Sequence, residues 1–337
     1  MKIGKFDTDK KVFIIAELSA NHRGSLQIAL DTIYAAKEAG ADAIKLQTYT
    51  PEWMTIDCKK EDFIIKGGTL WDGKNLFELY KEAMMPLQWH EELFKYARSL
   101  GLEIFSSPFS KKAVDFLEQF NPPAYKIASF EISDYELIRY TATKNKPMII
   151  STGIATLQEI QDVVEICKNN DLALLKCTSA YPAPRSDVNL KTIQALKEIF
   201  NVEVGFSDHT LGISAPIAAV TMGARIIEKH FILNKSLNTP DKDFSLTPKE
   251  FKNMVQSIRE TEEMIGEINF KPKKGREFAR SLYVVKDIKK DEKFTEENIK
   301  AIRPGYGLHP KYLPNILDKK ACRNLQKGDR LKWEDIY

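Results

Sequence analysis

Two lysines, Lys45 and Lys126, stand inside short apolar runs at residues 43–46 and 124–128. A lysine near a strand is often a surface residue whose alkyl stem packs on the protein while its ammonium group reaches water. Inside an apolar run, however, an ammonium group without a partner is expensive. A bound phosphate or carboxylate would compensate both charges. The two lysines therefore indicate an anion-binding site.

Five serines lie at or just beyond the ends of similar apolar runs. They are Ser107, Ser129, Ser151, Ser179 and Ser207. Each serine alone is explained as well by the cap of a following helix. Five hydroxyl groups at the ends of consecutive runs, beside two lysines, favour a cradle for phosphate and carboxylate groups.

Two histidines, His209 and His230, end two consecutive apolar runs, so their imidazoles can meet if these runs are neighbouring strands. Two imidazoles do not complete the shell of a divalent ion. Glu17 and Gln47 end two other runs, and with water they can complete a mixed shell that suits Mn²⁺ or Mg²⁺. A hydrogen-bonded pair of core histidines is the alternative interpretation.

These residues need a scaffold that brings the ends of many apolar runs to one place. From Lys11 to about residue 265, short β-branched runs alternate with amphipathic stretches such as residues 26–39 and 157–168. The runs cover residues 12–16, 43–46, 102–105, 124–128, 147–151, 172–177, 202–206 and 224–228. Their nearly continuous apolar character is typical of parallel strands covered on both faces.

Eight strand–helix units are the number that closes a (β/α)8 TIM barrel. A doubly wound open sheet is the main competitor, but no Gly-x-Gly-x-x-Gly follows the first run. In a barrel, the C-terminal ends of all strands converge on one mouth, where the chemistry of such folds is found. The barrel therefore places the lysines, serines and histidines around a single site.

The connection from Tyr49 to about Leu87 is too long for an ordinary loop, and its segment 66–73 predicts an ordered lid. We expect the barrel to occupy residues 1–268. Residues 269–280, rich in Lys, Pro and Gly at their start, are typical of a linker. Residues 281–337 then form a second domain, too small to be very stable alone.

Bulk properties exclude several classes of protein. The 337 residues carry 50 basic and 47 acidic side chains, and the net charge of +3 gives no argument for a nucleic acid or a membrane surface as partner. No apolar run reaches the length of a membrane span, and the N-terminus lacks the pattern of a secretory signal. Four widely spaced cysteines predict reduced thiols and a cytoplasmic protein.

The same residues lie in motifs that resemble the sialic acid synthase family in order and spacing. The motifs cover residues 45–48, 126–131, 151–153, 207–210 and 228–231. Arg303-Pro304-Gly305 and Leu308 resemble the C-terminal antifreeze-like (SAF) domain of that family. The resemblance therefore covers nearly the whole chain and implies a TIM barrel followed by a SAF domain.

Residues 16–22, Ala-Glu-Leu-Ser-Ala-Asn-His, resemble the pseudaminate-forming branch of the family, and Ser179 stands where the neuraminate branch has asparagine. The implied reaction condenses phosphoenolpyruvate with 2,4-diacetamido-2,4,6-trideoxy-L-altrose and releases phosphate. Synthesis of N-acetylneuraminate or legionaminate is the nearest alternative, followed by a phosphoenolpyruvate-dependent aldose-phosphate synthase. A non-catalytic glycan-binding protein is the alternative from another class.

The resemblance also implies roles for individual residues. Phosphoenolpyruvate would contact Lys45, Ser107, Lys126, Ser129, Ser151, Ser179 and Ser207. Glu17 would handle a proton beside the two lysines, and His209 and His230, with Gln47 nearby, would bind Mn²⁺, or else Mg²⁺ or Co²⁺. The sugar would contact Asn21, Glu131, Tyr181, Asp241 and Arg303. Arg303 would come from the small domain of a partner subunit, which implies a domain-swapped homodimer.

Overall fold

The structure is a computed structural model that describes residues 1–66, 68, 70–272 and 274–337. It divides into two compact units, Met1–Gly266 and Glu267–Tyr337. Within the described residues, no helix is both long enough and apolar enough to cross a membrane.

The first unit is built on eight parallel strands that close into a barrel. The strands are β3 (Phe13–Glu17), β4 (Ala43–Thr48), β5 (Glu103–Pro108), β6 (Tyr125–Ile127), β7 (Met148–Ser151), β8 (Leu172–Cys177), β9 (Glu203–Asp208) and β10 (Ile226–His230). Each strand pairs with its neighbours along the chain, and β10 pairs with β3 to close the ring. The predicted (β/α)8 barrel is confirmed, and each of the eight predicted runs overlaps one of its strands.

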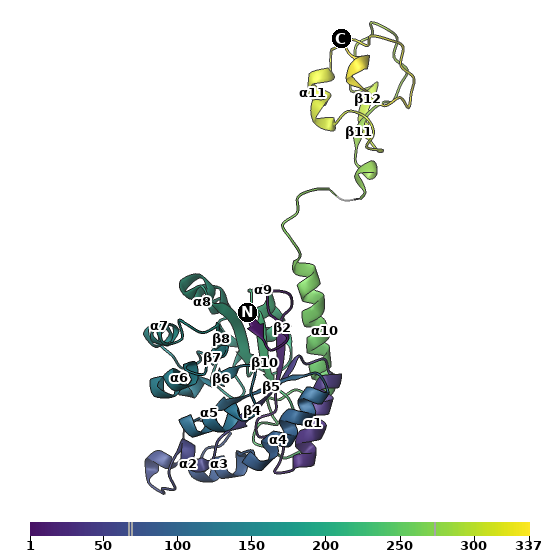
Figure 1. Cartoon of the computed structure of the whole chain (residues 1–337). Helices are drawn as coiled ribbons and strands as arrows, with labels where there is room; N and C mark the ends of the chain where they lie inside the picture. The colour runs from purple at the N-terminus through teal and green to yellow at the C-terminus, as the bar shows by residue number, and fades with distance from the viewer. Residues whose placement is uncertain (67, 69, 273) are drawn as a thin grey trace. The chain divides into compact units, whose positions relative to one another are not determined.

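Helices surround this barrel (Figure 1). The main ones are α1 (Leu26–Glu38), α4 (His90–Ser99), α5 (Lys111–Glu118), α6 (Tyr135–Ala142), α7 (Leu157–Ile166), α8 (Thr192–Phe200), α9 (Ser214–Thr221) and α10 (Pro248–Ile265). Their starts follow ordinary capping chemistry: Thr156 with Glu159, and Thr247 with Glu250, form capping boxes for α7 and α10. The last helix, α10, packs beside α1 and so closes the outer layer.

Alternation of side chains along each strand creates two separate cores. Residues such as Ile14, Ile44 and Phe206 point outward and pack with apolar residues of the helices. The inner cluster fills the barrel and consists of Ile3, Phe13, Ile15, Ala43, Phe105, Ala124, Ile149, Ala173, Leu175 and Ile226. The barrel is therefore packed solid below its mouth, so that a ligand has access only from the C-terminal ends of the strands.

A short hairpin that the sequence patterns did not predict belongs to this inner cluster. Strands β1 (Lys2–Ile3) and β2 (Phe6–Asp7) pair antiparallel before the first barrel strand. Ile3 is fully buried in the inner cluster, and Phe6 packs against it with its ring 4.7 Å from that of Phe13. The hairpin contributes to the inner core, but its two-residue strands are too short to show a period of their own.

The long connection between β4 and α4 has structure of its own. It contains α2 (Pro51–Met54), a 3₁₀ turn at Glu61–Phe63 and α3 (Leu76–Ala83). Asn75 pairs with Ile64 in an isolated bridge and caps α3 by accepting from the backbone N–H groups of Phe77 and Glu78. Gly67 and Thr69 of the predicted lid lie outside the described residues, and the described parts of the segment are ordered by these contacts.

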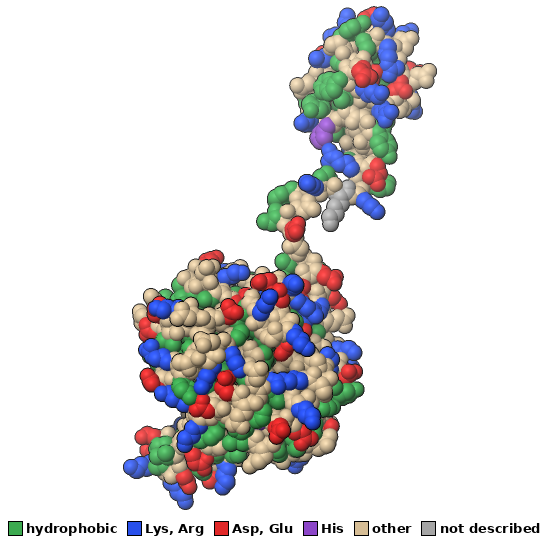
Figure 2. Space-filling model, viewed as in Figure 1, with side chains coloured by type: hydrophobic (Ala, Val, Ile, Leu, Met, Phe, Trp, Pro, Cys, Tyr) green, Lys and Arg blue, Asp and Glu red, His purple; other side chains and the backbone are tan. Residues whose placement is uncertain are grey.

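The second unit has a small core of its own. Strands β11 (Ser281–Val284) and β12 (Ile299–Ile302) pair antiparallel, and α11 (Leu313–Ile316) follows. Its cluster includes Leu282, Phe294 and Leu331, all fully buried. Figure 2 shows basic and acidic side chains interspersed over the visible surface of the chain, in agreement with the near balance of charge.

Candidate functional site

A polar layer lies directly above the inner cluster at the C-terminal ends of the strands. Because side chains two apart share a face of a strand, the layer consists of the next inward residue of every strand. In chain order these residues are Glu17, Lys45, Ser107, Lys126, Ser151, Cys177, Ser207 and Glu228, and each is at most 5% exposed. Seven of the eight strands therefore present a polar or charged side chain at the same depth, and β8 presents the thiol of Cys177.

Four charges form a connected network in this layer. Lys45 Nζ lies 2.5 Å from Glu17 Oε2 and donates to Ser107 Oγ at 3.3 Å. Lys126 Nζ donates to Ser151 Oγ at 2.7 Å. Glu228 lies between the two lysines, with its Oε1 at 3.8 Å from each Nζ. The network holds two ammonium groups close together, as a site for a multiply charged anion requires.

Burial and pairing shift the pKa values of the network in different directions. Burial raises the pKa of Glu17 against the opposing charge of Lys45, and burial lowers the pKa of Lys126. For Glu228, burial is outweighed by Lys126 and Lys45, which hold the pKa of its carboxyl below the usual value. For Lys45, burial is outweighed by Glu17 and Glu228, which raise the pKa. Glu228 is thus the more firmly ionised of the two carboxyl groups.

The remaining hydroxyl groups border this network. Ser207 Oγ donates to Glu228 Oε1 at 3.0 Å, and Ser179 Oγ donates to Ser129 Oγ at 2.8 Å. A Cβ on Gly153, just beyond β7, would lie 2.3 Å from Ser179 Oγ and 2.6 Å from Ser129 Oγ. Glycine is therefore required for these two hydroxyl groups to approach the chain after β7. All five predicted serines line the mouth or its rim.

The two histidines face each other across neighbouring strand ends, with ring centroids 5.4 Å apart. His209 Nδ1 is 3.0 Å from the carbonyl oxygen of Thr178, which fixes the proton on Nδ1 and leaves Nε2 with a free lone pair. Burial lowers the pKa of His209 to about 3, so its ring is neutral. His230 Nδ1 is buried, 3.5 Å from Asp241 Oδ2, and has no hydrogen bond in the described part of the chain.

The predicted metal ligands His209, His230 and Gln47 all lie at this mouth. Two imidazoles, one backed by a carbonyl oxygen and the other by a carboxylate, suit a divalent ion. Gln47 Nε2 donates to Glu17 Oε1 at 3.2 Å, which brings both residues to the same mouth. Among the described residues, no group of three or more His, Cys, Asp or Glu side chains is arranged to hold a metal. The histidine pair therefore fits a metal only if substrate or water supplies the other ligands.

An aromatic wall stands beside the histidines. The ring of Tyr181 lies 4.3 Å from that of His209, and Phe244 lies 4.9 Å from His230. Trp71, from the long connection after β4, lies 5.7 Å from Tyr181. Glu131 is near the mouth, and burial raises its pKa to about 7. Apolar surface next to polar groups is typical of a pocket for an organic ligand larger than phosphate.

Comparisons with known proteins agree with this architecture. A sequence model of the NeuB family matches residues 32–270, and one of the SAF domain matches residues 279–336. The chain belongs to the NeuB family. The predicted resemblance to sialic acid synthases with a C-terminal SAF domain is confirmed.

Three relatives of this NeuB-family chain are informative. A pseudaminic acid synthase of Campylobacter jejuni is 56% identical over the full length of both chains. An N,N'-diacetyllegionaminic acid synthase of Legionella pneumophila is 39% identical over 96% of this chain and 94% of the relative. The crystal structure of an N-acetylneuraminic acid synthetase from Leptospira borgpetersenii in complex with citrate has a TM-score of 0.73 at 30% identity, covering 81% of this chain and 92% of that one.

Two residues of the polar layer were not predicted as site residues. Glu228 bridges the lysines, and Cys177, 1% exposed, has its Sγ 3.8 Å from His209 Nδ1. Glu228 lies in a predicted motif, but the position of its carboxylate between two lysines from other strands depends on closure of the barrel. The sequence signal that could have identified Glu228 is the alternation of side chains along a strand, which places Glu228 on the same inward face as Ile226.

Asn21 and Arg303, which the sequence predicts as sugar contacts, are not among the residues of the polar layer. The side-chain amide of Asn21 donates to Phe231 O and Ser245 Oγ, both at 2.9 Å, and its oxygen accepts from Thr239 Oγ1 at 2.6 Å. Asn21 therefore ties the loop after β10 to the loop after β3. Arg303 is exposed and belongs to the second unit of this NeuB-family chain.

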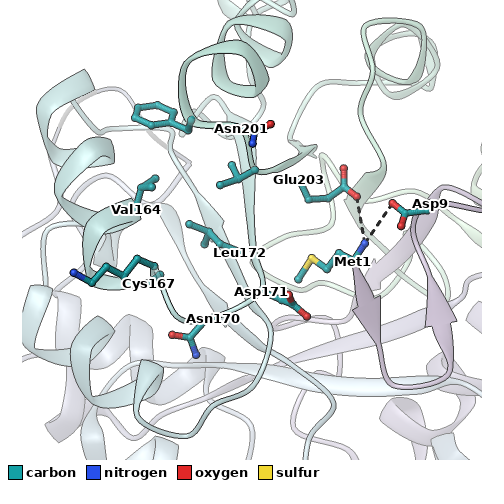
Figure 3. Close-up of a pocket in the computed structure, with 12 residues that line it drawn as sticks. Met1, Asp9, Val164, Cys167, Asn170, Asp171, Leu172, Asn201 and Glu203 are labelled. Atoms are coloured by element: carbon teal, nitrogen blue, oxygen red, sulfur yellow. Dashed lines mark hydrogen bonds and ion pairs between the residues drawn. The ribbon is translucent and has the colours of Figure 1, made fainter.

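A cavity of about 540 Å³ lies away from the polar mouth, at the N-terminal ends of β8 and β9 (Figure 3). Its lining includes Leu172 and Glu203, the first residues of these strands. The amino group of Met1 lies 3.4 Å from Asp9 Oδ1 and 3.9 Å from Glu203 Oε2. These charges pair with one another, and we assign no chemistry to this cavity.

Proposed function

We propose that the chain is a pseudaminic acid synthase that condenses phosphoenolpyruvate with 2,4-diacetamido-2,4,6-trideoxy-L-altrose to give pseudaminic acid and phosphate. The observation that carries the proposal is the 56% identity to a pseudaminic acid synthase over the full length of both chains, against 39% to a legionaminic acid synthase. The polar mouth supports it, since it offers paired cations, hydroxyl groups and a carboxylate at the end of a closed barrel.

Phosphoenolpyruvate would bind through its two anionic ends to the lysine pair and the serines. Lys126 with Ser151, and Lys45 with Ser107, each present an ammonium group beside a hydroxyl donor. Charge-assisted hydrogen bonds of this kind orient an anion as well as attract it. After C–O cleavage, the same groups would hold the departing phosphate. The cradle would thus bind the substrate and stabilise the leaving group.

Glu17 is the residue that we propose to act on a proton or water at C2 of the enol phosphate. Its carboxylate contacts Lys45 and Gln47, so its two oxygens are fixed in direction. When C3 attacks the sugar aldehyde, positive charge develops at C2, and a nearby carboxylate stabilises it and steers the incoming water. Burial favours the neutral acid and raises the pKa of Glu17, which suits a group that exchanges protons.

A divalent cation, Mn²⁺ in our proposal, would be held by His209 and His230. When bound, such an ion acts as a Lewis acid that polarises the carbonyl oxygen of an aldehyde. The charge balance of the mouth also favours a cation: Lys45 and Lys126 are already offset by Glu17 and Glu228. A substrate with a phosphate and a carboxylate brings more negative charge than the lysines can neutralise.

The sugar would lie against the aromatic wall of Tyr181, Phe244 and Trp71, with Glu131 and Asp241 as polar contacts. Burying an extra methyl group discriminates by only about 1–3 kcal/mol, so hydrogen bonds to the acetamido groups must supply most of the selectivity. We further propose that Arg303 reaches the sugar from a partner subunit in a domain-swapped homodimer, and that the enzyme acts in the cytoplasm, where its four free thiols would stay reduced.

A panel of sugars tests the proposed function by phosphate release. Purified protein with phosphoenolpyruvate and Mn²⁺ is mixed with the altrose derivative, with N-acetylmannosamine, or with the legionaminate precursor. We expect turnover with the altrose derivative. Turnover with another sugar instead would keep the chemistry and replace the substrate. No phosphate release with any of the three, from folded and metal-loaded protein, would contradict the proposal and favour a glycan-binding protein.

A further inference from the structure

Behind the two histidines lies a fully buried ion pair that the proposed reaction does not use. Lys229 Nζ is 2.6 Å from Asp208 Oδ2, and both side chains are 0% exposed. Asp208 and Lys229 are direct partners in the register of β9 and β10. Since His209 and His230 follow them in sequence, the ion pair lies on the outer side of the barrel wall and the imidazoles on the inner side.

Stability alone is a weak reason for such a pair. Desolvation of two charges offsets most of their attraction, and an apolar pair of similar volume is often as stable or more so. The two preceding outward residues, Phe206 and Ile227, are apolar and pack against the helices. At the next outward position, the charged pair Asp208–Lys229 takes the place of such an apolar pair. It lies directly beside the histidines.

The hydrogen bonds of the pair converge on the backbone of one residue, Thr210. Asp208 Oδ1 accepts from the backbone N–H of Thr210 at 2.8 Å, and Lys229 Nζ donates to the carbonyl oxygen of Thr210. The residues on both sides of His209 are thereby tied to Lys229, which directly precedes His230. On its other side, His209 is held by the carbonyl of Thr178 and by the backbone N–H of Ala183, which donates to His209 O at 2.9 Å.

We infer that the Asp208–Lys229 pair positions His209 relative to His230, and so sets the affinity of the mouth for a divalent cation. The inference rests on the proposed metal role of the two histidines. Groups that orient metal ligands from behind typically change metal affinity by about 10- to 100-fold when removed. Asp208 and Lys229 are positioning residues in this sense, since neither side chain reaches the inner face of the barrel.

The test is Mn²⁺ binding by calorimetry to the full-length protein, with and without phosphoenolpyruvate. We expect Lys229→Met to weaken Mn²⁺ binding by about tenfold or more. The matched control is Arg259→Met, which breaks another pair, Asp42 Oδ2 to Arg259 Nη2 at 2.6 Å, at the N-terminal end of β4. This control should lower the midpoint of thermal unfolding and leave Mn²⁺ affinity unchanged.

A second variant keeps the test valid if Lys229→Met fails to fold because Asp208 is left unpaired. Asp208→Asn/Lys229→Met removes both charges, so we expect its thermal unfolding midpoint to return toward that of the wild type. Its Mn²⁺ affinity should stay low, because the carbonyl of Thr210 has lost its donor. Recovery of both properties in the double variant would overturn the positioning role.

The outcomes separate this inference from the proposed function. Wild type that binds Mn²⁺, together with a Lys229→Met or double variant that binds it equally well, overturns the inference alone. Wild type that binds no Mn²⁺ under either condition overturns the metal role of the histidines and this inference with it. In that case, phosphate release in the absence of metal would still support the proposed reaction.

Discussion

Four charged side chains of the mouth are removed from water, and their desolvation costs free energy. Glu17, Lys45, Lys126 and Glu228 are all nearly inaccessible, yet each has an opposite charge within 4 Å. Their attraction offsets the desolvation, and the site is close to neutral before a ligand arrives. Substituting any one of them changes both the net charge and the geometry of the other three.

Glu228→Gln tests the role of the bridging carboxylate. Glutamine keeps an acceptor for Ser207 but removes the charge between the two lysines. We expect kcat to fall by about tenfold or more, because the ammonium groups lose the group that holds them together. The KM for phosphoenolpyruvate should not rise, since the cradle gains positive charge.

Steady-state kinetics at fixed Mn²⁺ and saturating sugar measures both values for Glu228→Gln. Ser207→Ala is the control: it removes the hydrogen bond from Ser207 to Glu228 and leaves all four charges in place. A raised KM with unchanged kcat in Glu228→Gln would show that Glu228 acts only in ground-state binding.

Glu131 predicts a pH-dependent stability. Burial raises its pKa from 4.5 to about 7, and its Oε2 has no hydrogen-bond partner in the part of the chain that the structure describes. Below pH 4.5 the group is protonated in both states, so it carries no penalty. As pH rises toward 7 and beyond, the unfolded state ionises freely, and the folded state loses up to about 3 kcal/mol of relative stability.

We therefore expect Glu131→Gln to gain stability over the wild type as pH rises from 4.5 to 7, and the gain to level off above 7. Chemical unfolding of both proteins at pH 5 and pH 8 measures the difference. Glu78→Gln, at an exposed position on α3, is the control for replacing a glutamate by glutamine at the surface. A constant difference for Glu131→Gln would mean that its carboxyl ionises normally in the folded protein.

At the scale of elements, the strands divide the barrel by depth. Residues such as Ile15 and Ile226 make the lower layer apolar, and Glu17 and Glu228, two positions later, make the upper layer polar. The apolar layer is rigid and closely packed, which fixes the strand ends that carry the site. The N-terminal hairpin contributes to this layer, although it lies at the opposite end from the mouth.

Ile3→Ala tests whether the apolar layer contributes to stability without affecting substrate binding at the mouth. Ile3 is fully buried in the inner cluster, so removing most of its side chain should lower stability by about 2–5 kcal/mol. Both KM values should stay unchanged, because the hairpin packs against the inner cluster, below the polar layer of the mouth. Thermal unfolding and kinetics of Ile3→Ala, compared with those of Ile56→Ala at a position 61% exposed, check both statements. A large change in KM would show that the inner layer transmits strain to the mouth.

At the scale of the whole molecule, the proposed exchange of small domains has a direct test. Lys126→Ala damages the barrel site, and Arg303→Ala removes the proposed sugar contact of the small domain. If Arg303 acts in the partner's barrel, a mixed dimer of the two variants contains one site with both residues intact. Random exchange of subunits should then recover about one quarter of wild-type activity.

Phosphate release after mixing measures this recovery, with native mass spectrometry to verify that subunits have exchanged. Each variant alone is the control, and Arg303→Ala should raise the KM of the sugar more than that of phosphoenolpyruvate. No recovery in a verified mixture would show that each barrel uses the Arg303 of its own chain.

Much of this arrangement was predictable from sequence. The eight strands were predictable because buried parallel strands are continuous apolar runs, and the lysines and serines because polar residues at run ends are conspicuous. Helix boundaries followed to within a few residues, as for α1 and α7. The N-terminal hairpin was missed, since two-residue strands have no periodicity, and Cys177 was missed because a thiol at the end of an apolar run looks like packing.

The sequence by itself determined the barrel, the polar character of its mouth and the family, because each depends on residue types and their spacing along the chain. Only the tertiary structure decided which charges meet. Glu228 lies between Lys45 and Lys126, and Asp208 lies opposite Lys229. The residues that meet in these contacts are separated in sequence by 19 positions at the least and by well over a hundred at the most. These partners are set by closure of the ring, which brings strands together in a register that no local pattern specifies.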